Sequence, residues 1–172
     1  MQQGDFLDEC QVHFPILNVM KNAAITADGE ELKIPADIRS YNFIVMSHSC
    51  DIQQRKIELV LVCPYWELQI FQEQNSFFRG NEGKEKLKKG EVVGYHLLNK
   101  CAIEGFSKSF IVVNFRSVYS IPLEVAFQMA ADRGRRLRLL PPYREHLSQA
   151  FARFFMRVGL PTEISEADLM KG

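Results

Sequence analysis

Runs of apolar residues, each followed by polar or turn-forming residues, divide this sequence into predicted strands and helices. Residues 43–46 form a continuous apolar run, which is typical of a strand covered on both faces. Residues 57–63 form a second such run, and Pro64 is expected to end it. Because only a short polar segment separates the two runs, the sequence predicts that they pair as antiparallel strands.

Weaker patterns surround this predicted pair. Before it, a turn at residues 4–6 leads into a strand, Pro15 favours an edge strand or a bend, and residues 21–40 indicate a hairpin or a long loop. After it, residues 66–71 are predicted to form a helical turn, and the charged residues 79–91 a solvated helix or loop. Further strands are expected at residues 92–98, 109–115 and 118–121, followed by a helix at 123–131.

The C-terminal part of the chain carries the clearest helical pattern. Pro141 and Pro142 suit the start of a helix, because the first backbone amides of a helix lack partners in any case. Gly159 is expected to end the helix. The apolar residues recur with the spacing of one helical stripe: Leu147, Ala150, Phe151, Phe154, Phe155 and Val158. Burial of the phenylalanine rings, at roughly 1.5–3 kcal/mol each, would seat this helix on a sheet face or on a partner.

The order of these patterns predicts the fold class. Strand patterns precede helical ones, which indicates an α+β protein with a barrel or a strongly curved sheet as its core. The 172 residues, 47% of them hydrophobic, suffice for one packed globule. We expect a single domain, 1–172, in which residues 1–121 form the β-barrel core, 122–160 the helical extension and 161–172 a flexible tail.

Composition restricts the classes of partner and compartment. Lys plus Arg and Asp plus Glu both number 21, so an argument for nucleic acid must come from local clusters of charge. No apolar run approaches the roughly 18–20 residues that span a bilayer. The N-terminus lacks the basic and apolar regions of a signal peptide. We therefore expect a cytoplasmic protein with no membrane partner.

The cysteines are scattered without a Cys-x-x-Cys pair: Cys10, Cys50, Cys63 and Cys101. In a reducing compartment they are expected to be free thiols. A zinc site built from Cys50, His48, Cys63 and His96 is conceivable, but its spacing is not a recognised zinc pattern. The sequence thus predicts neither a metal nor another cofactor.

Four segments follow one another in a suggestive order: Gly4-Asp5 near the start, the apolar strand that ends at Ser47, VLVCPY at residues 60–65 and SFIVVNFRSV at residues 109–118. In order and hydrophobic pattern they resemble the toxins of the MazF/PemK family. The resemblance implies a small SH3-like (MazF/PemK-type) β-barrel followed here by C-terminal helices. It also implies RNA cleavage without metal, often by a homodimer. The chain departs from the family at its catalytic arginine, since Tyr41 leads the central strand and Arg39 lies two residues earlier.

A cluster of reactive side chains, SHSCD at residues 47–51, follows the first strongly predicted strand. In a ribonuclease, His48 would act as the acid or the base, because imidazole titrates near neutral pH. Arg116 would stabilise the charge of the phosphate, and Ser49 or Asp51 would orient His48. The alternative is structural, with the hydroxyl and carboxylate groups only capping a turn through hydrogen bonds to local backbone amides.

A thiol nucleophile is a competing interpretation of the same cluster. Cys50 lies two residues from His48, and on an extended strand the two side chains would point the same way. A catalytic cysteine needs an imidazole within hydrogen-bonding reach. However, no glycine-flanked nucleophile turn or distant His-Asn signature accompanies Cys50, and a free buried cysteine is the commoner case.

An arginine-rich segment is the strongest sequence signal for a partner: Arg133, Arg135, Arg136 and Arg138. Guanidinium groups suit phosphate, so this segment would give salt-dependent binding to RNA or DNA. The same arginines would also suit a helix interface or pairing with acidic residues of another subunit.

The leading prediction is a cytoplasmic nucleic-acid-binding MazF/PemK-like protein of a bacterial toxin or defence system, with metal-independent RNA cleavage as its candidate activity. Its partners would be RNA or DNA, an antitoxin or other protein partner, and a second copy in a homodimer. The alternative is a non-enzymatic protein-interaction module that docks through the C-terminal amphipathic helix.

Overall fold

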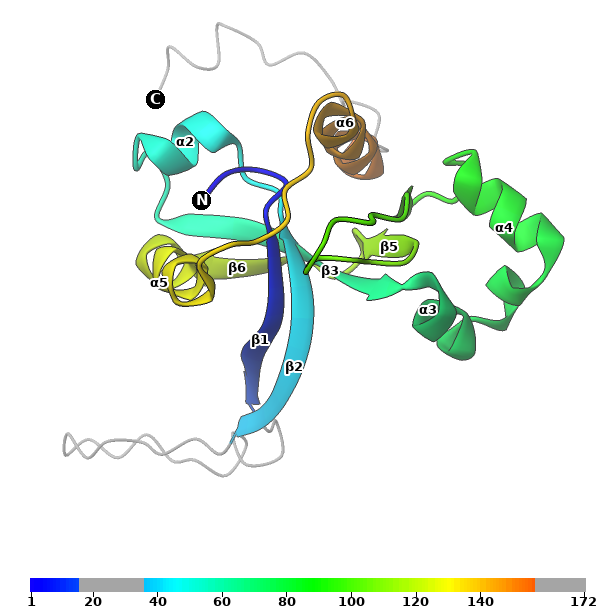
Figure 1. Cartoon of the computed structure of the whole chain (residues 1–172), viewed down its shortest axis with the longest axis horizontal. Helices are drawn as coiled ribbons and strands as arrows, with labels where there is room; N and C mark the ends of the chain where they lie inside the picture. The colour runs from blue at the N-terminus through cyan, green and yellow to red at the C-terminus, as the bar shows by residue number, and fades with distance from the viewer. Residues whose placement is uncertain (16–35, 157–172) are drawn as a thin grey trace, which may run out of the picture.

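The core of the protein is a six-stranded antiparallel sheet, seen in a computed structural model that describes residues 1–15 and 36–156 (Figure 1). The strands are β1 (Phe6–Pro15), β2 (Ala36–Val45), β3 (Leu59–Glu67), β4 (Tyr95–Leu98), β5 (Ile111–Asn114) and β6 (Tyr119–Pro122). They lie in the order β1-β2-β3-β5-β4, and β6 also pairs with β3. This confirms the α+β class, the antiparallel pairing of the two strongest apolar runs and the edge position of the first strand.

The sheet is not closed into a barrel, so the prediction of an SH3-like β-barrel is wrong in this respect. β1 and β4 lie at opposite ends of the strand order, and the described residues contain no pairing between them. The continuous apolar runs required only that both faces be covered, and helices supply that cover. Phe43 and Val45 pack on one face with α5 (Leu123–Arg133), whereas Ile44 packs on the other with α6 (Tyr143–Phe155).

The C-terminal helix α6 begins directly after the proline pair, as the sequence predicts. Leu147 is fully buried, and Phe151 and Phe154 pack around the buried ring of Phe115. Phe155 is 56% exposed. Most of the predicted apolar stripe therefore seats α6 on the sheet (Figure 1).

Parts of three predictions lie outside the described residues. They are residues 21–35 of the predicted hairpin or loop, Val158 and Gly159 at the expected end of the C-terminal helix, and the predicted tail at 161–172. Residues 36–40 belong to β2.

Short helices lie beside the sheet: α2 (Ser49–Gln53) after β2, and α3 (Leu68–Gln74), η1 (Ser76–Arg79) and α4 (Asn81–Lys88) between β3 and β4. The last three pack an apolar cluster against β5, formed by Phe71, Phe78, Leu87 and Val112. The solvated helix predicted within residues 79–91 is confirmed as α4. The helical turn predicted at 66–71 begins only at Leu68, because Trp66 and Glu67 still pair with β5.

Pro64 lies inside β3, so the prediction that it ends this strand is wrong. It is opposite Phe43 of β2 in the register of the sheet. On the other side of β3, the ladder with β6 ends at Val62 and the ladder with β5 begins at Tyr65. A proline, which has no amide hydrogen to donate, is accommodated in a central strand at such a gap.

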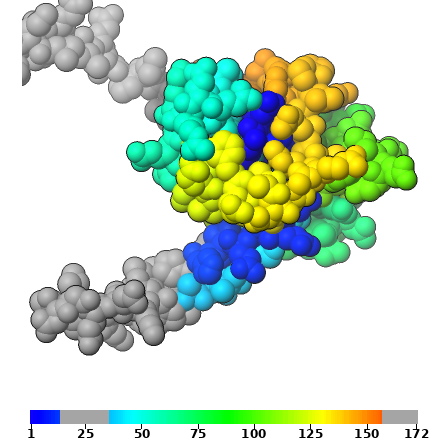
Figure 2. Space-filling model, turned by 60° about the vertical axis from the view of Figure 1, so that its left-hand side comes forward, coloured from blue at the N-terminus to red at the C-terminus, as the bar shows by residue number. Residues whose placement is uncertain are grey.

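The N-terminal residues hold the segment between α5 and α6 against the sheet (Figure 2). The amide of Phe6 donates to the carbonyl of Leu137 over 3.0 Å, and the amide of Leu139 donates to the carbonyl of Gly4 over 3.0 Å. Gly4 has a φ of +81°, and a Cβ there would lie 3.1 Å from Cβ of Leu139. The Gly-Asp opening of the chain is therefore a packing site for this later segment.

Candidate functional site

The SHSCD cluster forms the connection from β2 into α2. The hydroxyl of Ser47 accepts a hydrogen bond from the amide of Leu61 over 2.8 Å, and the hydroxyl of Ser49 accepts one from the amide of Gln3 over 3.1 Å. Both serines thus bind backbone amides, but the donors are distant in sequence, so these hydrogen bonds are not the local turn caps of the structural alternative. His48 is the exposed N-cap residue of α2, and its imidazole has no hydrogen bond within the described residues.

The predicted thiol pair is not formed. Cys50 lies in α2 rather than on an extended strand, so the prediction that Cys50 and His48 point the same way is wrong. Positions two apart do not face each other on a helix. Cys50 is exposed, and Asp51 lies beside it in the first turn of α2.

Arg116 contacts a different part of the molecule from His48. Its guanidinium lies over the ring of Tyr95, 4.9 Å from the ring centroid. Gly94 permits this approach, since a Cβ at its φ of +100° would lie 2.8 Å from Nε of Arg116. Within the described ranges, no hydrogen bond or ion pair joins the residues of the predicted catalytic set, His48, Ser49, Asp51 and Arg116.

The zinc set considered from the sequence is not assembled either. Across residues 1–15 and 36–156, no group of three or more His, Cys, Asp and Glu residues is placed to hold a metal ion. Cys63 lies fully buried inside the sheet, where burial raises the pKa of its thiol to about 12. His48 is exposed at the surface.

The arginine-rich segment is largely occupied by contacts within the chain. Asp5 is fully buried, and its carboxylate accepts hydrogen bonds from Nε of Arg136 over 2.9 Å, from Arg138 and from the amide of Gln2 over 3.0 Å. Burial alone would raise the pKa of Asp5, but the hydrogen bonds from Arg138, Gln2 and Arg136 lower it below its ordinary value. Two of the four predicted phosphate-binding arginines therefore neutralise a buried carboxylate.

The other two arginines have weaker internal contacts. Arg133 donates to the carbonyl of Met129 over 3.3 Å, and the guanidinium of Arg135 lies 5.5 Å from the ring centroid of Phe106. Both line a cavity of about 330 Å³ that Asp8 and Glu9 also line. These carboxylates oppose the binding of an anion there.

A larger cationic cavity, of about 510 Å³, lies between the edge strand β4 and α6. Its basic lining residues come from three elements and the turn after α4: Lys88, Lys89, His96, His146 and Arg153. Within residues 1–15 and 36–156, no aspartate or glutamate lines it. We call it the two-histidine cavity, and it has the charge that a phosphate group requires.

Helix and strand geometry bring these side chains together. His146 and Arg153 are seven positions apart on α6, which places them on one face two turns apart. His96 of β4 stacks on Phe115, with ring centroids 6.3 Å apart and an interplanar angle of 22°. Tyr95, which carries Arg116 over its ring, lines the same cavity. Arg116 itself does not line the two-histidine cavity.

The electrostatics of this cavity act on His96. Burial, followed by the nearby positive charges of His146 and Arg153, lowers the pKa of His96 to about 4. His96 is therefore neutral at pH 7, with a ring nitrogen able to accept a proton. A neutral imidazole beside a second imidazole and an arginine can accept a proton at a bound phosphate, and its pKa of about 4 makes His96 a weaker base than an ordinary histidine.

Sequence reasoning named His96 only as a conceivable zinc ligand and did not identify His146. A usable signal existed in α6, because His146, Gln149, Ala150 and Arg153 follow the spacing of one helix face. What the sequence could not supply is the packing of this face against β4.

No family model, curated protein or solved structure matches the chain. None of the helices in the described ranges is long and apolar enough to cross a membrane. A function must therefore be argued from the geometry and chemistry of the two-histidine cavity.

Proposed function

We propose that this protein binds RNA in the two-histidine cavity and cleaves it without a metal ion. The observation that carries the proposal is the lining of this cavity, which combines two imidazoles with Lys88, Lys89 and Arg153 and, in the described part of the chain, contains no carboxylate. Lysine and arginine attract phosphate, and a cavity of one charge sign concentrates an anionic ligand. This site replaces His48 as the proposed centre of the chemistry.

The cleavage step uses only groups of the chain and the RNA. Neutral His96 accepts the proton of the ribose 2′-hydroxyl as its oxygen forms a bond to phosphorus. The bond from phosphorus to the 5′-oxygen breaks, and His146 donates a proton to that oxygen. Arg153 stabilises the extra negative charge of the pentavalent phosphate. The products are a 2′,3′-cyclic phosphate and a 5′-hydroxyl end.

The wider role in a bacterial toxin or defence system is part of the same proposal. It is supported by the resemblance of the Gly4-Asp5 opening and the strand segments to the MazF/PemK toxins, and it would add an antitoxin as a protein partner. The alternative of docking through α6 has less support, because Leu147, Phe151 and Phe154 already pack against the sheet.

Incubation of the protein with labelled single-stranded RNA in the presence of EDTA tests the proposal. We expect cleavage that survives chelation and leaves cyclic phosphate ends, while DNA of the same sequence binds but stays intact because it lacks the attacking 2′-hydroxyl. His48→Ala is the matched control and should cleave at the rate of the unmodified protein. Cleavage that disappears with EDTA, or in His48→Ala, would contradict the proposed site.

A further inference from the structure

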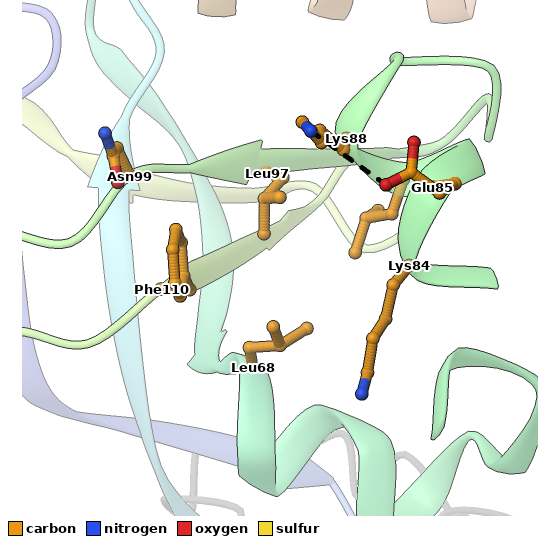
Figure 3. A pocket seen from close by; sticks show the side chains of 8 residues that line it. Leu68, Lys84, Glu85, Lys88, Leu97, Asn99 and Phe110 are labelled. Atoms are coloured by element: carbon orange, nitrogen blue, oxygen red, sulfur yellow. Dashed lines mark ion pairs between the residues drawn. The ribbon is translucent and has the colours of Figure 1, made fainter. Parts of the chain in front are cut away.

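A second cavity, of about 540 Å³, shares Lys88 with the two-histidine cavity, and Figure 3 shows the residues that line it. Its floor is apolar and is formed by Leu68, Leu87, Leu97 and Phe110. Polar groups line the remainder: Lys84, Glu85, Lys88 and Asn99. We call it the apolar cavity, and the proposed cleavage step leaves it without a role.

The two cavities lie on opposite faces of the same edge strand. Successive side chains of a strand point to opposite faces, so Leu97 of β4 lines the apolar cavity while His96 lines the two-histidine cavity. Lys88, at the end of α4, lines both. Because β4 is at the end of the strand order, no further strand of the described chain separates the two cavities at this edge.

The lining of the apolar cavity matches the chemistry of a nucleobase. The ring of Phe110 is 41% exposed and belongs to none of the buried core clusters, so it is available for stacking. Figure 3 shows Phe110, Leu97 and Leu68 gathered on one side, with Lys84 and Lys88 projecting from α4 on the other. Oδ1 of Asn99 accepts a hydrogen bond from the amide of Lys100 over 2.9 Å, so its Nδ2 is the group available to donate to a base edge.

Charge favours a base that belongs to an RNA chain over an uncharged apolar ligand. Lys84 and Lys88 would lie beside the phosphates that flank the base. Glu85 offsets this charge only in part, since its carboxylate lies 3.9 Å from Nζ of Lys88 and both side chains are well exposed. Lys88 is placed to contact the sugar-phosphate backbone of an RNA that passes from one cavity to the other.

We propose that the apolar cavity is a nucleobase subsite for the RNA whose scissile phosphate occupies the two-histidine cavity. This inference rests on the proposed function. The base would stack on Phe110, which tolerates different bases because every base has a π-face. Asn99 would then add a preference for particular bases through hydrogen bonds to the base edge.

Fluorescence anisotropy with two labelled strands of equal length, one of ordinary RNA and one of abasic RNA, tests the subsite. Phe110→Ala should weaken binding of ordinary RNA by about 5- to 100-fold, which corresponds to the loss of one base stack, and should leave binding of the abasic strand unchanged. Phe110→Tyr keeps the ring and should bind both strands as the unmodified protein does. Phe77→Ala, at another exposed phenylalanine that lines neither cavity, is the matched control.

The failure of the subsite is distinguishable from the failure of the proposed function. If the unmodified protein binds both strands and Phe110→Ala changes neither affinity, or both equally, the subsite is overturned and the two-histidine cavity stands. If Phe110→Ala instead alters self-association in sedimentation while RNA affinity is kept, the apolar cavity is a protein interface and the subsite is overturned. If the unmodified protein binds neither strand, both proposals are overturned.

Discussion

Replacement of His96 by alanine is expected to reduce metal-independent RNA cleavage by about 10²- to 10⁴-fold, the range that a positioned acid or base contributes. The expected cause is the loss of an imidazole that burial keeps neutral at pH 7. The measurement is the single-turnover rate of cleavage of labelled RNA in EDTA. RNA affinity should fall far less, because Lys89 and Arg153 remain to attract the phosphates.

The pH profile separates this role from a structural one. Because the proton acceptor must be neutral, the acid limb of the pH profile should lie near the pKa of about 4 for His96, rather than near 6.5. His146→Ala provides a second variant at an exposed residue, whose loss should not disturb folding. Full cleavage by both variants, with near-ultraviolet circular dichroism unchanged, would contradict the assignment of the two histidines.

Asp5→Asn is expected to lower the free energy of unfolding by about 3–5 kcal/mol, the cost of removing one partner from a buried ion pair. The fully buried carboxylate of Asp5 is held by Arg136 and Arg138, whose side chains would keep their charge without a counterion. Urea denaturation at pH 7 measures the change. Asp37→Asn is the matched control, because Asp37 pairs with Arg39 at an exposed position. This substitution should lower the free energy of unfolding by less than about 1 kcal/mol.

The contribution of Asp5 to the free energy of unfolding should also depend on pH. The folded protein lowers the pKa of Asp5 below its ordinary value of 3.8, so the carboxylate stabilises the fold at every pH above that value. This stabilisation is lost as the pH falls below 3.8 through the lower pKa of the folded state. The difference between the unmodified protein and Asp5→Asn should therefore shrink in acid. Equal costs for Asp5→Asn and Asp37→Asn at pH 7 would contradict the role of Asp5.

Local sequence patterns predicted those strands and helices in which buried side chains recur at regular spacing along the sequence. The run at 43–46 indicated the pairing of β2 with β3 because both faces of these strands are covered, and the spacing of Leu147, Phe151 and Phe154 indicated the buried face of α6. Closure of the sheet was not predictable in this way. Covering by helices and closure into a barrel demand the same apolar runs, so the pattern cannot distinguish them.

Long-range contacts determined the features that the sequence did not reveal. Arg136 and Arg138 were interpreted as phosphate ligands because nothing local indicates that Asp5 lies against them. His96 and His146 lie on different elements, and only the packing of α6 on the sheet brings them to one cavity. The SHSCD cluster drew attention by its composition, yet its serines bind backbone amides.

The location of bound RNA tests the central claim most directly. Photochemical cross-linking of the full chain to labelled single-stranded RNA, followed by mass spectrometry of the peptides, would identify the residues in contact. The proposed function predicts cross-links at residues 88–96 and 146–153, with the subsite adding Phe110. Cross-links confined to residues 47–51 or 133–138 would contradict the proposed function. The absence of any cross-link at an RNA concentration that saturates binding would also contradict it.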